Sequence, residues 1–266
     1  MADSPETKAP QAQAPVCRRL VGRTAVITGA GGGIGLAAAR RLAAEGAKVV
    51  CADLDERAGH AAARQVGGLF VHTDVTDPAM VEALFDEAYE TCGSVDVAFN
   101  NAGARSSEDE SNFAASPDVR RRAQEADLAA VRLCCDAALP YMRRHGRGSI
   151  INTVSFAASP GAEPSRISGA ASGGGVPALS RELGLRFARE GIRVNALVPG
   201  PVDTPLLREL IAADPERAAR RLGQIPLGRL AAPEEIAAAV AFLASDDSSF
   251  VTASEFRVDG GMSATP

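Results

Sequence analysis

The chain has 266 residues, of which 46% are hydrophobic and 23% charged, and its formal net charge is −5. This length and composition suit one α/β domain or two small ones, with room for a large core. The acidic balance and the scattered arginines argue against a nucleic-acid partner, and no apolar run approaches the roughly 20 residues of a membrane span.

The first segment is rich in alanine, proline and glutamine and lacks the pattern of a signal peptide. We therefore predict a flexible N-terminal tail over residues 1–18 and one domain over residues 19–266. The cysteines at positions 17, 51, 92, 134 and 135 show neither a disulfide framework nor a metal-binding spacing. We interpret them as thiols in a reduced cytoplasm and predict no metal site.

Short β-branched runs alternate with longer amphipathic segments along the whole chain. This alternation predicts a parallel sheet with helices on both faces, that is, a single doubly wound Rossmann-like α/β domain with a seven-stranded parallel sheet. The predicted strands are Thr24–Thr28, Lys48–Ala52, Leu69–His72, Val95–Phe99, Ser149–Asn152, Arg193–Leu197 and Glu255–Val258.

A glycine-rich run follows the first predicted strand and opens a helix. Its sequence is Thr28-Gly29-Ala30-Gly31-Gly32-Gly33-Ile34-Gly35. Glycines let the backbone approach a pyrophosphate, while the N–H groups and the dipole of the following helix face the anion. The run predicts a dinucleotide site formed by Gly29, Gly31, Gly33, Ile34 and Gly35.

Asp53 closes the second predicted strand, 18 residues beyond Gly35. A carboxylate at this distance suits hydrogen bonds from the adenine ribose hydroxyls and would repel a 2′-phosphate. No Arg or Lys lies within the glycine run to hold such a phosphate. We therefore expect NAD(H) to be preferred over NADP(H).

Three further motifs follow later strands, namely Asp74-Val75, Asn100-Asn101-Ala102-Gly103 and Pro199-Gly200-Pro201-Val202-Asp203-Thr204. With the glycine run, they make residues 20–262 resemble the short-chain dehydrogenase/reductase family. The resemblance implies that Asp74 and Val75 contact the adenine, and that Asn101, Ala102 and Gly103 shape the sheet edge beside the cofactor. It also implies a nicotinamide end wrapped by Pro199, Gly200, Val202 and Thr204, and a homodimer or homotetramer in which long helices pair.

The family's reaction uses a tyrosine and a lysine four residues apart, supported by a serine and an asparagine. In the segment Ser168-Gly169-Ala170-Ala171-Ser172-Gly173-Gly174, the resemblance puts Gly169 at the tyrosine position and Gly173 at the lysine position. Ser155 takes the serine position and Asp127 takes that of the asparagine. No tyrosine or lysine follows residue 141 to replace the missing pair. Carbonyl reduction by the family mechanism should therefore be absent or very slow.

Three functions remain open. The first is a non-standard or inactive family member that binds NAD(H), as a sensor or as a subunit stabilising a partner. The second is a lyase, isomerase or cyclase in which Asp127 or Ser155 moves the proton, although the position of Asp127 favours a surface or interhelical carboxylate beside Arg120-Arg121-Arg122. The third is a slow NAD-dependent oxidoreductase with substrate-assisted proton transfer.

The same segment carries residues that disfavour a helix. Gly169 is followed by Gly173-Gly174-Gly175 and then by Pro177. A glycine inside a helix costs about 1 kcal/mol relative to alanine and an interior proline about 3 kcal/mol, but proline is tolerated in the first turn. We predict a helix that begins near Pro177 and runs through Leu179–Ala188, with residues 169–176 as a loop or frayed turn.

Overall fold

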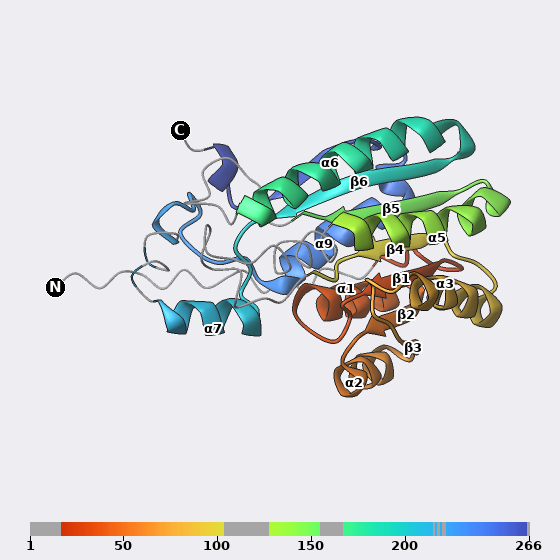
Figure 1. The fold of residues 1–266 in the computed structure, drawn as a ribbon, viewed down its shortest axis with the longest axis horizontal. Helices are drawn as coiled ribbons and strands as arrows, with labels where there is room; N and C mark the ends of the chain where they lie inside the picture. Colours follow the sequence, from red (N-terminus) through yellow and green to blue (C-terminus); the bar gives the residue numbers. More distant parts are fainter. Residues whose placement is uncertain are drawn as a thin grey trace.

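The computed structural model describes residues 17–103, 128–154, 167–214, 216, 219 and 222–264. It contains one sheet of seven parallel strands in the order β3-β2-β1-β4-β5-β6-β7 (Figure 1), which confirms the predicted fold. The strands are β1 (Thr24–Thr28), β2 (Lys48–Asp53), β3 (Leu69–His72), β4 (Val97–Asn100), β5 (Gly148–Thr153), β6 (Ile192–Pro199) and β7 (Glu255–Val258).

The order of the strands changes direction between β1 and β4. The chain moves outward from β1 to β3, then returns to place β4 on the other side of β1, with Ala25 opposite Val97. In such sheets ligands bind outside the carboxyl ends of the strands, at the point where the direction changes. Every residue of β1 and of β4 is buried, as expected for strands covered on both faces.

Helices cover both faces of the sheet. On one face, α1 (Gly33–Ala44), α2 (Glu56–Val66) and α9 (Pro233–Ala244) share a core with Phe99, Ile151 and Leu197 of the sheet. On the other face, α3 (Pro78–Cys92), α5 (Ala130–His145) and α6 (Ile167–Phe187) share a second core with Ile150 and Val194. No helix among the described residues is long and apolar enough to cross a membrane.

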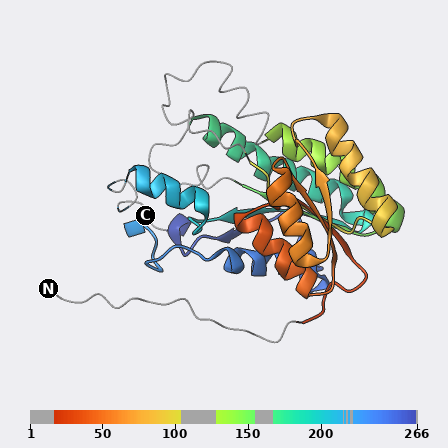
Figure 2. The same cartoon turned by 90° about the horizontal axis from the view of Figure 1, so that it is seen from below.

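Helix α7 (Pro205–Ala213) stands apart from these layers. In Figures 1 and 2 it lies at the same end of the molecule as the C-terminus of the chain, far from α3. Short 3-10 helices cover Ala188–Glu190, Asp246–Ser248 and Met262–Ala264.

The prediction of a late helix start is wrong, because α6 is helical from Ile167 to Phe187 and includes residues 169–176 and Pro177. Tertiary contacts compensate for the poor intrinsic propensity. A Cβ added at Gly175 would lie 2.8 Å from Leu128 Cδ2, so the glycine lets the helix pack closely on the residues before α5. At Gly184 an added Cβ would lie 2.7 Å from the backbone nitrogen of Ala253. Glycine thus weakens the helix locally but permits the close packing that holds it.

Candidate active site

Segments that follow β1, β2 and β4 are joined by hydrogen bonds at the carboxyl edge of the sheet. The N–H of Ala30 donates to the carbonyl of Ala52 at 3.1 Å. The N–H groups of Asn101 and Ala102 both donate to Thr28 Oγ1, at 3.0 and 3.1 Å. The structure therefore brings the predicted glycine run, the end of β2 and the Asn101 motif together at the switch point of the sheet.

The glycine run needs glycine at specific positions. Gly29 has a φ of +67° and Gly33 a φ of +51°, in the left-handed region that side chains rarely adopt. A Cβ added at Gly35 would lie only 2.0 Å from the carbonyl oxygen of Gly29. The loop can keep its shape only if these positions carry no side chain. The absence of side chains is also what lets a phosphate approach the backbone closely.

The N-terminus of α1 has no cap of its own. Gly32 is its N-cap, no side-chain hydrogen bond caps it, and its first turn contains no acidic residue. The neighbouring helices differ, because α2 is capped by Asp55 and α3 by Asp77. A Cβ added at Gly32 would meet no heavy atom within 4 Å, so the space beside this helix end is open. The unsatisfied N–H groups and the positive end of the helix dipole are features of an anion-binding site.

Asp53 holds its carboxylate beside the glycine run. Its Oδ2 accepts from the N–H of Gly31 at 2.7 Å, and its Oδ1 accepts from the N–H of Asp55 at 3.0 Å. A Cβ added at Gly31 would lie 2.8 Å from the same Oδ2 and 2.9 Å from Ala58 Cβ. The two backbone amides fix the carboxylate at the end of β2, while each of its oxygens keeps further lone pairs for a hydroxyl donor.

Other predicted site residues follow β3 and β6, and one of them contacts the glycine run. The methyl group of Thr204 would lie 3.2 Å from a Cβ added at Gly33, so the segment after β6 reaches the glycine run. Gly200 packs on the backbone of Asp259, and Val202 is buried. The Asp74 carboxylate is hydrogen-bonded within its own loop, because its Oδ1 accepts from the N–H and the hydroxyl of Thr76 at 2.9 and 2.7 Å.

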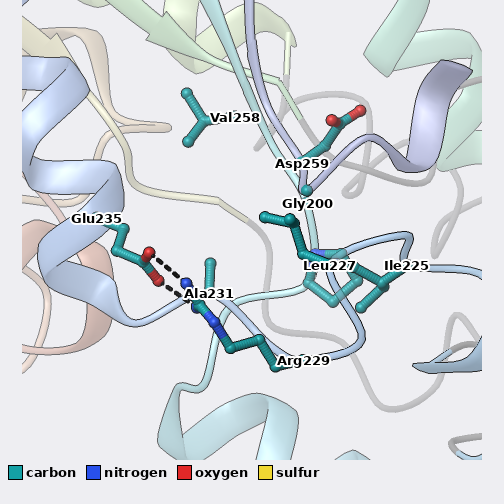
Figure 3. Close-up of a pocket in the computed structure, with 10 residues that line it drawn as sticks. Gly200, Ile225, Leu227, Arg229, Ala231, Glu235, Val258 and Asp259 are labelled. Carbon is teal, nitrogen blue, oxygen red and sulfur yellow. Dashed lines mark hydrogen bonds and ion pairs between the residues drawn. The ribbon is translucent and has the colours of Figure 1, made fainter. Parts of the chain in front are cut away.

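A cavity of about 70 Å³ lies behind the ends of β6 and β7 and is bordered by Gly200, Leu227 and Val258 (Figure 3). The Arg229 guanidinium donates to both carboxylate oxygens of Glu235, at 2.7 and 2.8 Å, and these bonds lower the pKa of Glu235. This volume is far below that of a cofactor pocket, so we assign the cavity no ligand. The Arg229–Glu235 pair was not predicted from the sequence, although Pro and Glu in the first turn of α9 are a signal for capping.

The positions predicted for proton transfer are only partly described. Ser155 and Asp127 lie outside the described residues. Gly169 and Gly173 belong to the backbone of α6, and the spacing of an α-helix puts them on the same face as Val176 and Ser180. That face turns toward the sheet, because Val176 is 3% exposed and Ser180 is 1% exposed. No cluster of His, Cys, Asp and Glu among the described residues is arranged to hold a metal ion.

Comparisons with known proteins agree with this geometry. A family model described as enoyl-(acyl carrier protein) reductase matches residues 29–263. The chain is 44% identical to cis-4-hydroxycyclohexanecarboxylate dehydrogenase of Sinomonas cyclohexanicum, over 91% of this chain and 97% of that protein. It is 38% identical to meso-2,3-butanediol dehydrogenase of Serratia marcescens, over 93% of this chain and 97% of that protein. The crystal structure of levodione reductase superposes with a TM-score of 0.88 at 34% identity, covering 93% of this chain and 100% of that chain.

Proposed function

Because the chain belongs to the short-chain dehydrogenase/reductase family of oxidoreductases, we propose that it binds NAD(H) at the carboxyl edge of its sheet but lacks the residues for rapid hydride transfer. In this proposal it is a non-standard family member whose cofactor site is retained. The nicotinamide cofactor, when bound, supplies hydride chemistry. The described residues bind and orient it.

The observation that carries the proposal is the uncapped N-terminus of α1, which lies beside a fixed Asp53 carboxylate. The helix end offers N–H groups to a pyrophosphate, and the glycine run gives access to them. Asp53 is held by the N–H groups of Gly31 and Asp55 in a position to accept from ribose hydroxyls. A 2′-phosphate would meet this carboxylate, so the arrangement favours NAD(H) over NADP(H).

The expected lack of rapid turnover rests on α6. Gly169 and Gly173 occupy the positions where the family has its tyrosine and lysine, and neither can donate a proton from a side chain. Loss of a positioned general acid lowers the rate by about 10²–10⁴-fold. Ser155 and Asp127 are the proton donors that we propose remain. By their names, two relatives act on a hydroxycyclohexanecarboxylate and on 2,3-butanediol, so we take small secondary alcohols and their ketones as the ligand class.

Calorimetric titration with NADH and NADPH tests the cofactor proposal. We expect micromolar binding of NADH and binding of NADPH that is at least about tenfold weaker, because a charge repulsion of about 1.4 kcal/mol is enough for that difference. Asp53→Ala should weaken NADH binding about 10–100-fold, since hydrogen bonds to a charged acceptor contribute about 1.5–3 kcal/mol each.

Asp77→Ala is the matched control, because Asp77 also follows a strand and accepts a backbone N–H, from Ala79 at 2.9 Å, but only caps α3. It should leave the affinity for NADH unchanged. Failure of both cofactors to bind, or equal binding of the two, would overturn the proposal. Turnover without any change in NADH, abolished by Asp127→Ala, would instead favour a lyase, isomerase or cyclase.

We also propose that the chain forms a homodimer or homotetramer in the cytoplasm. β7 is the last strand of the sheet, and the ring of its Phe256 packs on Phe242 of α9 with centroids 5.8 Å apart. Phe250, in the loop between α9 and β7, is fully exposed. A second copy would cover this apolar face and the open strand edge. Sedimentation velocity tests the assembly, and the free thiols of Cys51, Cys134 and Cys135 suit a reducing compartment.

A further inference from the structure

A buried chain of side-chain hydrogen bonds runs from β4 across β5 to α6. Asn100 Nδ2 donates to Asn152 Oδ1 at 2.7 Å, and Asn152 Nδ2 donates to Ser180 Oγ at 2.9 Å. The Ser180 hydroxyl donates to the carbonyl of Val176, one turn earlier in α6, at 2.7 Å. Asn100, Asn152 and Ser180 are 3%, 0% and 1% exposed, so water cannot replace a bond that is lost.

The amide of Asn100 depends on this chain for its orientation. Its Oδ1 is buried and accepts no hydrogen bond from any described residue, so its Nδ2 alone holds the side chain in place. α5 adds two weaker contacts, since the Cys135 sulfur lies 3.6 Å from Asn100 Nδ2 and 3.6 Å from Asn152 Oδ1. Burial raises the pKa of the Cys135 thiol, which therefore stays protonated and can donate.

The series of hydrogen bonds continues on the other side of β4, where it reaches the glycine run. Asn101, the next residue, donates from its Nδ2 to the carbonyls of Thr28 and Gly29, at 3.2 and 3.4 Å. Its backbone N–H donates to Thr28 Oγ1. Asn101, which follows β4, thus holds the glycine run on one side, and Asn100, the last residue of β4, holds helix α6 on the other side through Asn152.

We propose that Ser180 is a positioning residue for the cofactor site. Through Asn152 it fixes α6 against the sheet, and through Asn100 and Asn101 it fixes the shape of the glycine run. The inference rests on the proposed binding of NAD(H) for its functional consequence, but the coupling itself is a property of the free protein. The structure assigns this role to a residue that touches neither the glycine run nor Asp53.

The composition of α6 explains why this helix needs an anchor to the sheet. Its first half contains Gly173, Gly174 and Gly175, and Pro177 lacks the N–H that would bond to the carbonyl of residue 173. Ser180 is the first residue after this stretch whose side chain is hydrogen-bonded to the sheet. Without that bond, the anchored segment of α6 would begin later, and the glycine-rich turns would be free to open.

Ser180→Ala tests the proposal against Ser149→Ala as a matched control. Ser149 lies near the start of β5, is 2% exposed, and donates from its Oγ to the carbonyl of Leu243 at 2.7 Å. Both variants remove one buried serine hydroxyl that donates to a backbone carbonyl, but Ser149 lies at the end of the sheet far from the glycine run. The measurements are amide hydrogen exchange of the free proteins and calorimetric titration with NADH.

Ser180→Ala should speed exchange in residues 29–35 and 167–176 and raise the Kd for NADH about three- to tenfold, in the range of coupling through packed networks. Ser149→Ala should lower the melting temperature to a similar extent without either effect. Equal behaviour of the two variants in both measurements would overturn the proposal, as would unchanged exchange at residues 29–35 in Ser180→Ala. If no protein binds NADH, the proposed function fails, and the exchange data alone decide whether Ser180 positions the glycine run.

Discussion

Placing a tyrosine and a lysine at positions 169 and 173 of α6 should create the proton-transfer pair that we propose this protein lacks. The helix is already formed at positions 169 and 173, and both positions share the sheet-facing side of α6 with Ser180. Gly169→Tyr with Gly173→Lys should therefore place both side chains toward the cofactor edge of the sheet. A positioned general acid is worth about 10²–10⁴-fold in rate. Replacing two helical glycines should also stabilise the protein by roughly 1 kcal/mol.

The assay is NAD reduction, followed by absorbance, with a panel of secondary alcohols, and NADH oxidation with the corresponding ketones. The matched control is Gly169→Tyr with Gly174→Lys. Gly174 is exposed, and an added Cβ there meets nothing within 4 Å. Lysine at position 174 should therefore raise the helix propensity of α6 as much as lysine at position 173, but its side chain points to solvent. We expect turnover in the first double variant and none above the parent level in the control.

Two results would refute this reasoning. One is a folded, NADH-binding Gly169→Tyr/Gly173→Lys variant that remains inactive with every alcohol and ketone, since the pair would then not be the missing element. The other is a parent protein that already turns over as fast as the restored variant, since the glycines would then not limit the rate.

Two further predictions concern stability. Ala253→Gly should stabilise the protein by up to about 1 kcal/mol in urea denaturation, because Ala253 is held at a φ of +58°. Gly22→Ala, at a φ of +76° with no neighbour within 4 Å, should lose a similar amount, and an unchanged midpoint in both variants would contradict the strain argument. Although burial opposes ionisation of Glu45, hydrogen bonds from Arg19 and Arg41 lower its pKa from 4.5, so its contribution is present near neutral pH and is lost as the pH falls through the folded-state pKa. Glu45→Gln should cost roughly 2–3 kcal/mol at pH 7 and less at pH 3, and an equal loss at both pH values would contradict the linkage.

The inner strands of the sheet could be predicted because strands such as β1 and β4 are buried on both faces and read as short continuous apolar runs. The predicted bounds of β1 match the structure residue for residue, as do those of the partly exposed edge strands β3 and β7. β4 runs from Val97 to Asn100, so the predicted range Val95–Phe99 begins two residues early and ends one residue early. The Asp96 carboxylate before the strand accepts from the N–H of Thr24 and from Arg147, a polar role that the apolar pattern does not indicate.

The members of the proposed cofactor site could be named from the sequence, but their geometry could not. Glycine spacing and the distance to Asp53 are local features of the sequence. The bond from Gly31 to Asp53 and the missing cap of α1 emerge only when β1 and β2 are placed side by side. The start of α6 could not be derived, because its poor propensity is offset by close packing on residues such as Leu128, which lies 47 positions before Gly175.

The bare end of α1 ties the stability of the first β–α unit to whatever anion fills it. In the free protein no side chain caps those N–H groups, whereas α2 and α3 carry their own capping carboxylates. A bound dinucleotide would take over the work of a capping side chain, so part of its binding energy is folding energy. By mass action, a ligand at 100 times its Kd stabilises the folded state by about 2.7 kcal/mol. The abundance of this protein in a cell should therefore rise and fall with the pool of its cofactor, even where no reaction takes place.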